Sequence, residues 1–390
     1  MPGFELVGEE ERAAVNEVFD EGGILFRHGF DAMRKKGRFR VIEFEKAFAR
    51  HMEVDYALAV SSGTAALKVG LMAMGIKPGD EVITQAFTFV ATVEAILDVG
   101  AVPVMVNVDD TLNMDTEEVK RRITPRTRAI LPVHMLGVSP EMDEIMAIAR
   151  THGLLVLEDN CESPGATYGG RPLGTLGDVG AFSFDFGKML TTGEGGMVVT
   201  NNPEYYNLAR EYHDHGHESN PKFPRGRDTH RIPGFNYRMG ELQGAIGVVQ
   251  LQKLEYIVGQ NRQHYARLQE GLQQIEGLRF RRVPDKCGSL CDALIFQVPS
   301  KEVADQFAER MAAAKIGTKN LPDAMEWHFA GYWDHIFTRF GMTKETLWES
   351  LLPTYERLSR SIALPVMVKY TPERVGQIVE EIVRIAGELS

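Results

Sequence analysis

The chain has 390 residues, more than one hydrophobic core ordinarily serves, and this length predicts two domains. Its composition of 44% hydrophobic and 25% charged residues is typical of a soluble globular enzyme, and its net charge of −11 argues against a protein that binds nucleic acid. Three cysteines, no secretory leader and no apolar run of membrane-spanning length predict a reduced, cytoplasmic protein without a disulfide framework.

Short apolar runs alternate with helix-like segments between residues 56 and 200. The strands that we expect there are Tyr56–Val60, Glu81–Thr84, Val102–Val108, Ala129–Val133, Leu154–Leu157, Val179–Phe184 and Gly196–Thr200. Several are apolar on both faces, as in a parallel sheet that helices cover on both sides. The helices expected between them include Thr64–Met74 and Pro140–Thr151. This alternation predicts an open α/β sheet, in which ligands bind beyond the carboxyl ends of the strands.

A smaller domain is expected after this sheet. Arg238–Val258 has the apolar stripe of a long amphipathic helix and would lead into that domain. Beyond it we expect a strand over Ala293–Val298, a helix near Val303–Ala314 and a final helix that begins at Pro372 after an N-cap at Thr371. We therefore divide the chain into a large domain over residues 1–255, which includes the N-terminal segment, and a small α+β domain over 256–390.

Small residues follow the first expected strand. Ser61–Leu67, with the sequence SSGTAAL, places a turn of small side chains between a strand and a helix. Free backbone N–H groups at the positive end of a helix bind phosphate. A routine strand–helix turn has a similar composition, so the segment alone leaves both interpretations open. It lacks the three spaced glycines of a dinucleotide fingerprint.

Charged residues follow two later strands. Asp159 lies at the end of an apolar strand, where a carboxylate needs a cation such as a protonated pyridine nitrogen. A helix cap or a metal-bound carboxylate is the alternative. Lys188 lies between the strand ending near Ser183 and the Gly- and Thr-rich segment Leu190–Gly196, so it can reach back toward the sheet. Taken alone, a loop lysine is most often a surface residue.

The combination is more specific than any of its members. Pyridoxal phosphate (PLP) chemistry needs a seat for the phosphate, an aspartate that keeps the ring nitrogen protonated, and a lysine that forms a Schiff base and shuttles a proton. The turn at Gly63, Asp159 and Lys188 supply these three parts at one end of the expected sheet. The residues therefore predict a PLP enzyme.

Further motifs extend over much of the chain. They are Phe44-Glu45, Phe48-Ala49, Gly79–Ile83, Thr88–Thr92, Pro132–His134, Thr192–Gly196, Phe235–Met239 and Glu241–Gln243. Together with the three signals above, they resemble the DegT/StrS family of PLP-dependent sugar aminotransferases. The resemblance implies the α/β fold of fold-type I PLP aminotransferases: a large domain with a mostly parallel mixed sheet between helices, plus a smaller α+β C-terminal domain.

The resemblance also implies how the cofactor ring is held. Lys188 matches the Schiff-base lysine of the family, Asp159 the partner of the pyridine nitrogen, and Phe89 the aromatic residue that stacks on the ring. Glu162 stands where the family usually has a glutamine near the phenolic oxygen. A carboxylate there would raise the local proton affinity or need a nearby cation.

The cofactor phosphate has its own matches. Gly63, Thr64 and Ser183 match the residues that hold it within one subunit. Asn236 matches a residue that the family supplies from the neighbouring subunit. This match implies a homodimer with shared active sites.

A narrower set of motifs is similar to one branch of the family. These motifs are Met1–Leu6, Phe26-Arg27, Phe30-Asp31, Met33-Arg34, Asp214–His217, Trp327-His328, Trp333 and His335-Ile336. The branch forms 8-amino-3,8-dideoxy-manno-octulosonate, an acidic eight-carbon sugar of lipopolysaccharide, with glutamate as amino donor. On this basis we expect Arg27, Arg34, His134 and His215 to contact the substrate. The basic run over residues 34–40 either collects an anionic substrate or is a solvated face. No metal is expected.

The function predicted from these residues is transfer of an amino group from glutamate, or glutamine, to a keto- or aldehyde-sugar. A nucleotide-linked keto-hexose and a cyclitol are the alternative acceptors. PLP sugar dehydratases of the family replace the lysine with histidine, so Lys188 argues against that activity. A non-catalytic sensor is disfavoured because the full set of cofactor residues is kept. The expected partners are the sugar, the amino-acid donor and a second copy of the chain, with neither nucleic acid nor membrane.

Overall fold

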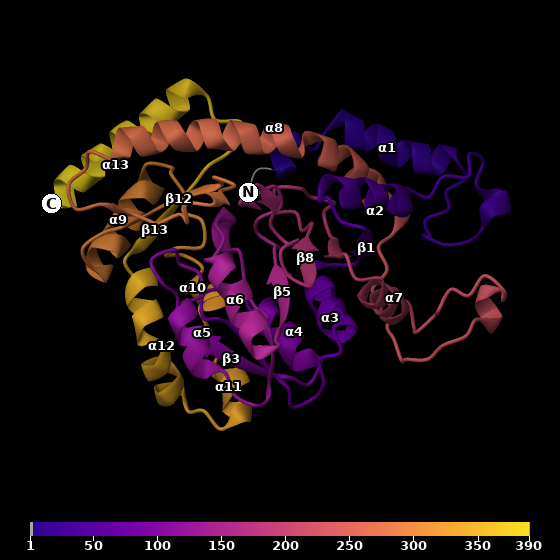
Figure 1. Ribbon diagram of the computed structural model, residues 1–390. Helices are drawn as coiled ribbons and strands as arrows, with labels where there is room; N and C mark the ends of the chain where they lie inside the picture. Colours follow the sequence, from indigo (N-terminus) through magenta and orange to yellow (C-terminus); the bar gives the residue numbers. More distant parts are fainter. Residues whose placement is uncertain (1–2, 390) are drawn as a thin grey trace.

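The computed structural model describes residues 3–389, so Met1 and Pro2 of the opening motif lie outside the described residues. Its centre is a seven-stranded sheet of order β1-β9-β8-β5-β4-β2-β3 (Figure 1). The strands are β1 (Tyr56–Val60), β2 (Glu81–Gln85), β3 (Val102–Val106), β4 (Thr127–Leu131), β5 (Leu155–Asp159), β8 (Val179–Ser183) and β9 (Gly196–Thr200). Strand β9 is antiparallel to both of its neighbours, and the other pairs are parallel. The expected mixed, mostly parallel sheet is confirmed.

Alternate side chains of these strands enter two different cores. Leu58 of β1 and Leu157 of β5 pack on one face, whereas Ala59 and Val156 pack on the other. The first face is covered by α3 (Gly63–Ala73), α4 (Ala91–Asp98) and α7 (Pro203–Tyr212), and the second by α2 (Arg40–His51), α5 (Thr116–Arg122) and α6 (Met142–His152). Because both faces are buried, the strands are nearly continuous apolar runs in the sequence.

Helix α8 (Glu241–Leu272) runs along the top of the molecule in Figure 1 and packs on α1, α2 and α13. It continues well beyond Val258, where its apolar stripe was expected to end. Two polar residues interrupt the stripe while staying on the buried face. Asn261 donates to the sulfur of Met189 at 3.7 Å, and the ring of His264 bonds to the carbonyl of Met367 at 3.0 Å. These partners lie far away in the sequence, so hydrophobic periodicity alone could not reveal the rest of the helix.

The C-terminal part forms a second, antiparallel sheet. Its strands are β10 (Arg279–Phe280), β12 (Ala293–Gln297) and β13 (Ser361–Pro365), and a third core joins it to α9 (Lys301–Ala313) and α13 (Pro372–Leu389). The hydroxyl of Thr371 accepts from the amide of Arg374 at 3.2 Å, which confirms the expected start of the last helix. A short three-stranded sheet is made of β6 (Thr167–Tyr168), β7 (Arg171–Pro172) and β11 (Cys287–Gly288).

One C-terminal segment returns to the large sheet. It comprises α10 (Met325–His328), η5 (Ala330–Tyr332), α11 (Asp334–Phe337), η6 (Thr338–Phe340) and α12 (Lys344–Leu358). Its buried residues Phe329, Trp333 and Leu351 belong to the first core, with α3 and α4. Helix α8 also runs unbroken across residue 255, so the division into 1–255 and 256–390 stays a prediction.

The N-terminal segment consists of η1 (Gly3–Leu6), α1 (Glu9–Asp20) and η2 (Asp31–Met33), and α1 packs along α8. Two further short turns are η3 (Met135–Gly137) and η4 (Arg225–Arg227). Among the helices of residues 3–389, none combines the length and the apolar composition that a membrane span requires.

Candidate active site

A cavity of about 420 Å³ lies beyond the carboxyl ends of β1, β5 and β8, where an open α/β sheet binds its ligands. Its volume is within the range of small-molecule sites. Seven of the residues predicted from the sequence line it together: Gly63, Thr64, Phe89, Asp159, Glu162, Ser183 and Lys188.

The expected phosphate seat is the start of α3. Ser62 caps this helix, because its hydroxyl accepts from the amide of Ala65 at 3.1 Å. Within residues 3–389, no group accepts a hydrogen bond from the amides of Gly63 and Thr64. Both amides are therefore available to an anion at the positive end of the helix. A Cβ atom on Gly63 would lie 2.7 Å from the Cβ of Ser183. Only glycine therefore lets the turn approach the end of β8.

Asp159 ends β5 and is 3% exposed. Its Oδ2 accepts from the hydroxyl of Thr92 at 2.8 Å, and its Oδ1 accepts from the amide of Cys161 at 3.1 Å. These two donors fix the orientation of the carboxylate, which lines the cavity. A buried carboxylate with neutral partners can bind a cationic nitrogen of a ligand.

Phe89 and His328 lie at another wall of the cavity, with ring centroids 5.4 Å apart. Backbone hydrogen bonds hold the two segments that carry them. The amide of Thr88 donates to the carbonyl of His328 at 2.9 Å, and the amide of Val90 donates to that of Trp327 at 3.0 Å. Phe89 is 43% exposed and so offers a free aromatic face to a planar ring.

Lys188 and Glu162 form an ion pair in the cavity, with 3.3 Å between Nζ and Oε1. Burial alone would raise the pKa of Glu162, but the charges of Lys188, Lys319 and His328 outweigh it and hold the pKa at about 2. Burial would likewise lower the pKa of Lys188, but Glu162 reverses this effect, so the pKa lies above its ordinary value. The cation that a carboxylate at position 162 was expected to need is therefore the lysine itself.

This arrangement fits PLP. A phosphate would meet the two amides of Gly63 and Thr64 and the hydroxyl of Ser183, and a protonated ring nitrogen would meet Asp159. Within residues 3–389, Lys188 is the one lysine that lines the cavity.

Comparison with known proteins also indicates a PLP enzyme. Residues 9–383 match the model of the DegT/DnrJ/EryC1/StrS aminotransferase family. The chain belongs to this family. It is an aminotransferase, and aminotransferases of this family use PLP.

Individual relatives support the assignment along the chain. The spore coat polysaccharide biosynthesis protein SpsC of Bacillus subtilis is 35% identical over 97% of this chain and 94% of its own length. GDP-perosamine synthase of Caulobacter vibrioides is 45% identical over 60% of this chain, and the match spans 63% of that relative. The crystal structure of the aminotransferase TlmJ from Streptoalloteichus hindustanus superposes with a TM-score of 0.84 at 28% identity and covers 98% of this chain and 97% of its own.

Further residues line the cavity of this chain, and no role was assigned to them from the sequence. They include Thr92, which orients Asp159, and Asn320 and His328, which come from the C-terminal part. Thr92 and His328 belong to motifs of the family resemblance, so their presence was visible in the sequence. Their contacts depend on how distant segments pack, which the sequence did not show.

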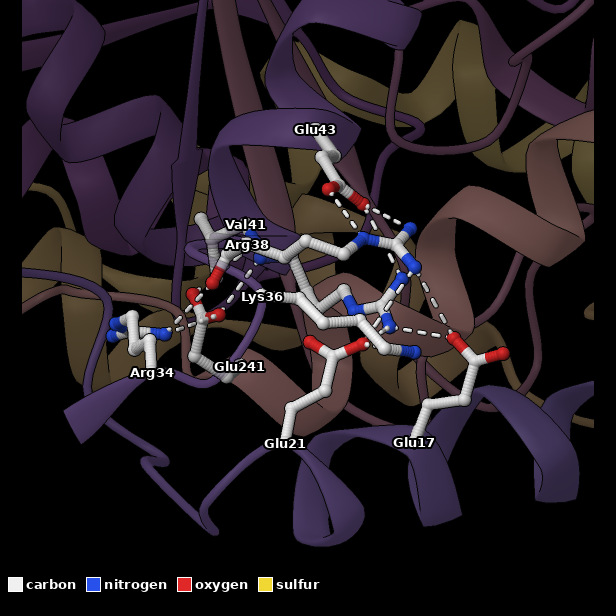
Figure 2. Close-up of polar contacts among 9 residues, drawn as sticks. Glu17, Glu21, Arg34, Lys36, Arg38, Val41, Glu43 and Glu241 are labelled. Carbon is white, nitrogen blue, oxygen red and sulfur yellow. Dashed lines mark hydrogen bonds and ion pairs between the residues drawn. The ribbon is translucent and has the colours of Figure 1, made fainter. Parts of the chain in front are cut away.

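The basic run over residues 34–40 does not line the cavity. Figure 2 shows its charged residues in an ion network between the N-terminal segment, α2 and the start of α8, in which Arg34 and Arg40 are buried whereas Lys36 is exposed. Buried Arg34 pairs with Glu241 at 3.2 Å, and buried Arg40 pairs with Glu17 at 2.6 Å. Arg34 and Arg40 therefore neither line the cavity nor belong to a solvated face.

The other expected substrate contacts are also placed away from the cavity. Arg27 is buried, pairs with Glu45 at 2.8 Å and donates to the carbonyl of Ala59 at 3.0 Å. The ring of His134 bonds to Glu158 at 2.8 Å, and both side chains are fully buried. His215 is exposed, and its amide bonds to the carbonyl of Phe235. None of the four residues expected to contact the substrate, Arg27, Arg34, His134 and His215, lines the cavity of its own chain, so a substrate contact of these residues stays a prediction.

Asn236 is exposed and forms an isolated bridge with Asp214. It does not line the cavity of its own chain. Its expected role in a neighbouring site stays a prediction.

Proposed function

We propose that the cavity holds PLP on Lys188 and that the enzyme transfers an amino group from glutamate, or glutamine, to the carbonyl carbon of a sugar. The observation that carries this proposal is the convergence of Lys188, Asp159 and the turn at Gly63 in one cavity. Each part alone has an ordinary structural explanation, whereas their meeting serves the three separate needs of PLP chemistry.

The residues of this chain have distinct tasks in such a transfer. When bound, PLP supplies an electron-withdrawing ring that stabilises negative charge next to the transferred nitrogen. Asp159 would hold the ring nitrogen protonated, and the seat at Gly63 and Ser183 would hold the phosphate. The Nζ atom of Lys188 takes a proton from one carbon and returns it to another. Glu162 lies 3.3 Å from this Nζ atom, close enough to orient it.

The acceptor that we propose first is an octulosonate with a terminal carbonyl, which the amination converts to 8-amino-3,8-dideoxy-manno-octulosonate. The motifs at Asp214–His217 and Trp327-His328 support this acceptor, and His328 lines the cavity. A nucleotide-linked keto-hexose is the second candidate, because a relative that is 45% identical over 60% of the chain is named GDP-perosamine synthase.

A second copy of the chain is part of the proposal. Within residues 3–389, the cavity lining includes no arginine and no lysine other than Lys188, yet glutamate and an octulosonate both carry carboxylates. Residues outside this chain's own cavity must therefore supply the cations. We assign them to a partner subunit in a homodimer, whose Asn236 segment would approach the phosphate.

Single-turnover kinetics with defined acceptors tests the choice of sugar. The enzyme is first aminated with glutamate, or with glutamine in a parallel series, and freed of donor. It is then mixed with the octulosonate aldehyde or with a GDP-linked keto-hexose, while the return of the PLP absorbance is followed. We expect faster return with the octulosonate. Faster return with the nucleotide sugar would select the second candidate, and no return with any carbonyl sugar would overturn the proposed function.

A further inference from the structure

The turn η3, which follows β4, has a strained backbone. Leu136 lies in the left-handed region at φ 51° and ψ 50°, and Gly137 follows at φ 77°. A side chain such as leucine disfavours this region, so the surrounding structure must hold it there. Val133 and Met135, on either side of His134, line the cavity. The strained residue therefore directly follows a residue of the cavity wall, Met135.

A buried arginine from the C-terminal part holds this turn. Arg281 follows β10, and its guanidinium donates to the carbonyls of Met135 at 2.8 Å, Leu136 at 3.3 Å and Thr111 at 2.5 Å. No described carboxylate forms an ion pair with it, and burial lowers its pKa to about 10. A buried cation is costly without a carboxylate at ion-pair distance, so the three carbonyls stabilise the charge together with the more distant Asp292 and Asp109.

On its other side, the turn is linked to Lys188 through the carboxylate of Glu162. The amide of Leu136 donates to Oε2 of Glu162 at 3.3 Å, and Oε1 of the same carboxylate lies 3.3 Å from Nζ of Lys188. The path from the guanidinium to the lysine thus runs through one strained peptide and one carboxylate. The neighbouring Arg282 has no contact with the turn: it is exposed and pairs with Asp109, Asp110 and Glu141.

We infer that Arg281 is a positioning residue for the cofactor lysine: it holds the left-handed turn at Leu136, which holds Glu162 against Lys188. Without Arg281, the carbonyls of Met135 and Leu136 lose their donor, and the strained turn relaxes. Glu162 then loses the Leu136 amide and moves away from the lysine. The inference rests on the proposed role of Lys188, but the geometry it concerns exists in the cofactor-free protein.

The test is the titration of Lys188 in cofactor-free protein. Competitive acetylation over a pH series, read by peptide mass spectrometry, reports the neutral fraction of this amine. We expect Arg281→Met to lower the midpoint by about one pH unit, because an opposite charge within a few ångströms shifts a pKa by roughly that much or more. Glu162→Gln should shift it in the same direction. The other titratable groups around this part of the cavity, which all variants keep, are Asp159, Cys161, Asp185, Glu194, Lys319 and His328.

Arg282→Met is the matched control, because it removes a cation from the adjacent position without touching the turn. It should leave the midpoint unchanged. Arg281→Lys keeps the charge with a different donor geometry, so its midpoint should lie between those of Arg281→Met and the wild type. A folded Arg281→Met protein with the wild-type midpoint would overturn the inference. If Arg281→Met does not fold, Arg281→Lys decides: a wild-type midpoint in that variant overturns the inference as well. Because no PLP is present, failure of the proposed function would not imitate either result.

Discussion

At the scale of single residues, the cofactor site depends on one missing side chain. Gly63 begins α3 and approaches the end of β8 so closely that an added Cβ would lie 2.7 Å from the Cβ of Ser183 and 3.0 Å from its hydroxyl. Neither neighbour is the flexible end of a long side chain. Any larger residue must therefore shift the turn or Ser183, both of which we assign to the phosphate.

Gly63→Ala should weaken PLP binding by roughly 5-fold to 150-fold. Crowding of a well-packed site by one methyl group costs roughly 1–3 kcal/mol, and 1.4 kcal/mol corresponds to a factor of ten. Absorbance titration of the cofactor-free variant with PLP measures the effect. Gly259→Ala in α8 is the control, because a Cβ there meets nothing within 4 Å. Equal affinity of Gly63→Ala and wild type would contradict the proposed phosphate seat.

Residue identities predicted that Gly63, Asp159 and Lys188 lie together, and the structure places all three in one cavity. Gly63, Asp159 and Lys188 were found because each was expected just after a strand of one sheet, at the edge where such a sheet binds its ligands. The arginines that we expected to contact the substrate do not line the cavity, and the reason is physical. The carboxylate that neutralises Arg34 is Glu241, about 200 residues away in the sequence, so the pairing is invisible until the chain is folded.

At the scale of elements, the ion network of Figure 2 fastens the N-terminal segment to the start of α8. Glu241, the first residue of α8, accepts from the backbone amides of Arg40 at 2.7 Å and Val41 at 3.3 Å and pairs with Arg34. Burial raises the pKa of Glu241 above its ordinary value in spite of these donors. The carboxylate therefore depends on Arg34 to stay charged inside the protein.

Arg34→Met should lower the free energy of unfolding by roughly 3 kcal/mol, because it leaves a buried carboxylate without its cation. Chemical denaturation of wild type and variant at one protein concentration measures this loss. Lys36→Met, which removes an exposed cation of the same run, should change it by less than about 0.5 kcal/mol. A variant at Arg34 with unchanged stability and a lost sugar half-reaction would instead restore Arg34 as a substrate residue.

Hydrophobic patterning predicted elements well where the buried face is purely apolar. Strands β1 and β3 and the final helix are cases of this kind. It failed for the second half of α8, where buried Asn261 and His264 replace apolar residues. It also gave no sign that α12 packs on the large sheet, because the apolar face of a helix does not say which surface will cover it.

At the scale of the whole molecule, the proposed homodimer makes two sites depend on each other. A Lys188→Ala chain and an Asn236→Ala chain are each expected to be inactive or nearly so. After subunit exchange, a hybrid dimer would hold one site with both changes and one with neither. Mixing the two variants should therefore restore part of the activity.

The exchange itself must be verified, for example with differently tagged chains that co-purify. Each variant mixed with itself is the control and should gain nothing. Verified hybrids without any regained activity would count against a shared site, provided that Asn236→Ala alone is impaired. The cytoplasmic location stays a prediction, and so does the division at residue 255, which α8 crosses without a break.

The most direct test of the account is to find which lysine carries the cofactor. The purified enzyme, loaded with PLP, is treated with borohydride, which reduces a carbon–nitrogen double bond and so fixes the cofactor to its lysine. Peptide mass spectrometry then locates the added group. We predict that it lies on Lys188 and that Lys188→Ala removes it. A label on another lysine, such as buried Lys319 beside Asp292, or no label at all, would contradict the assignment of this cavity as a PLP site.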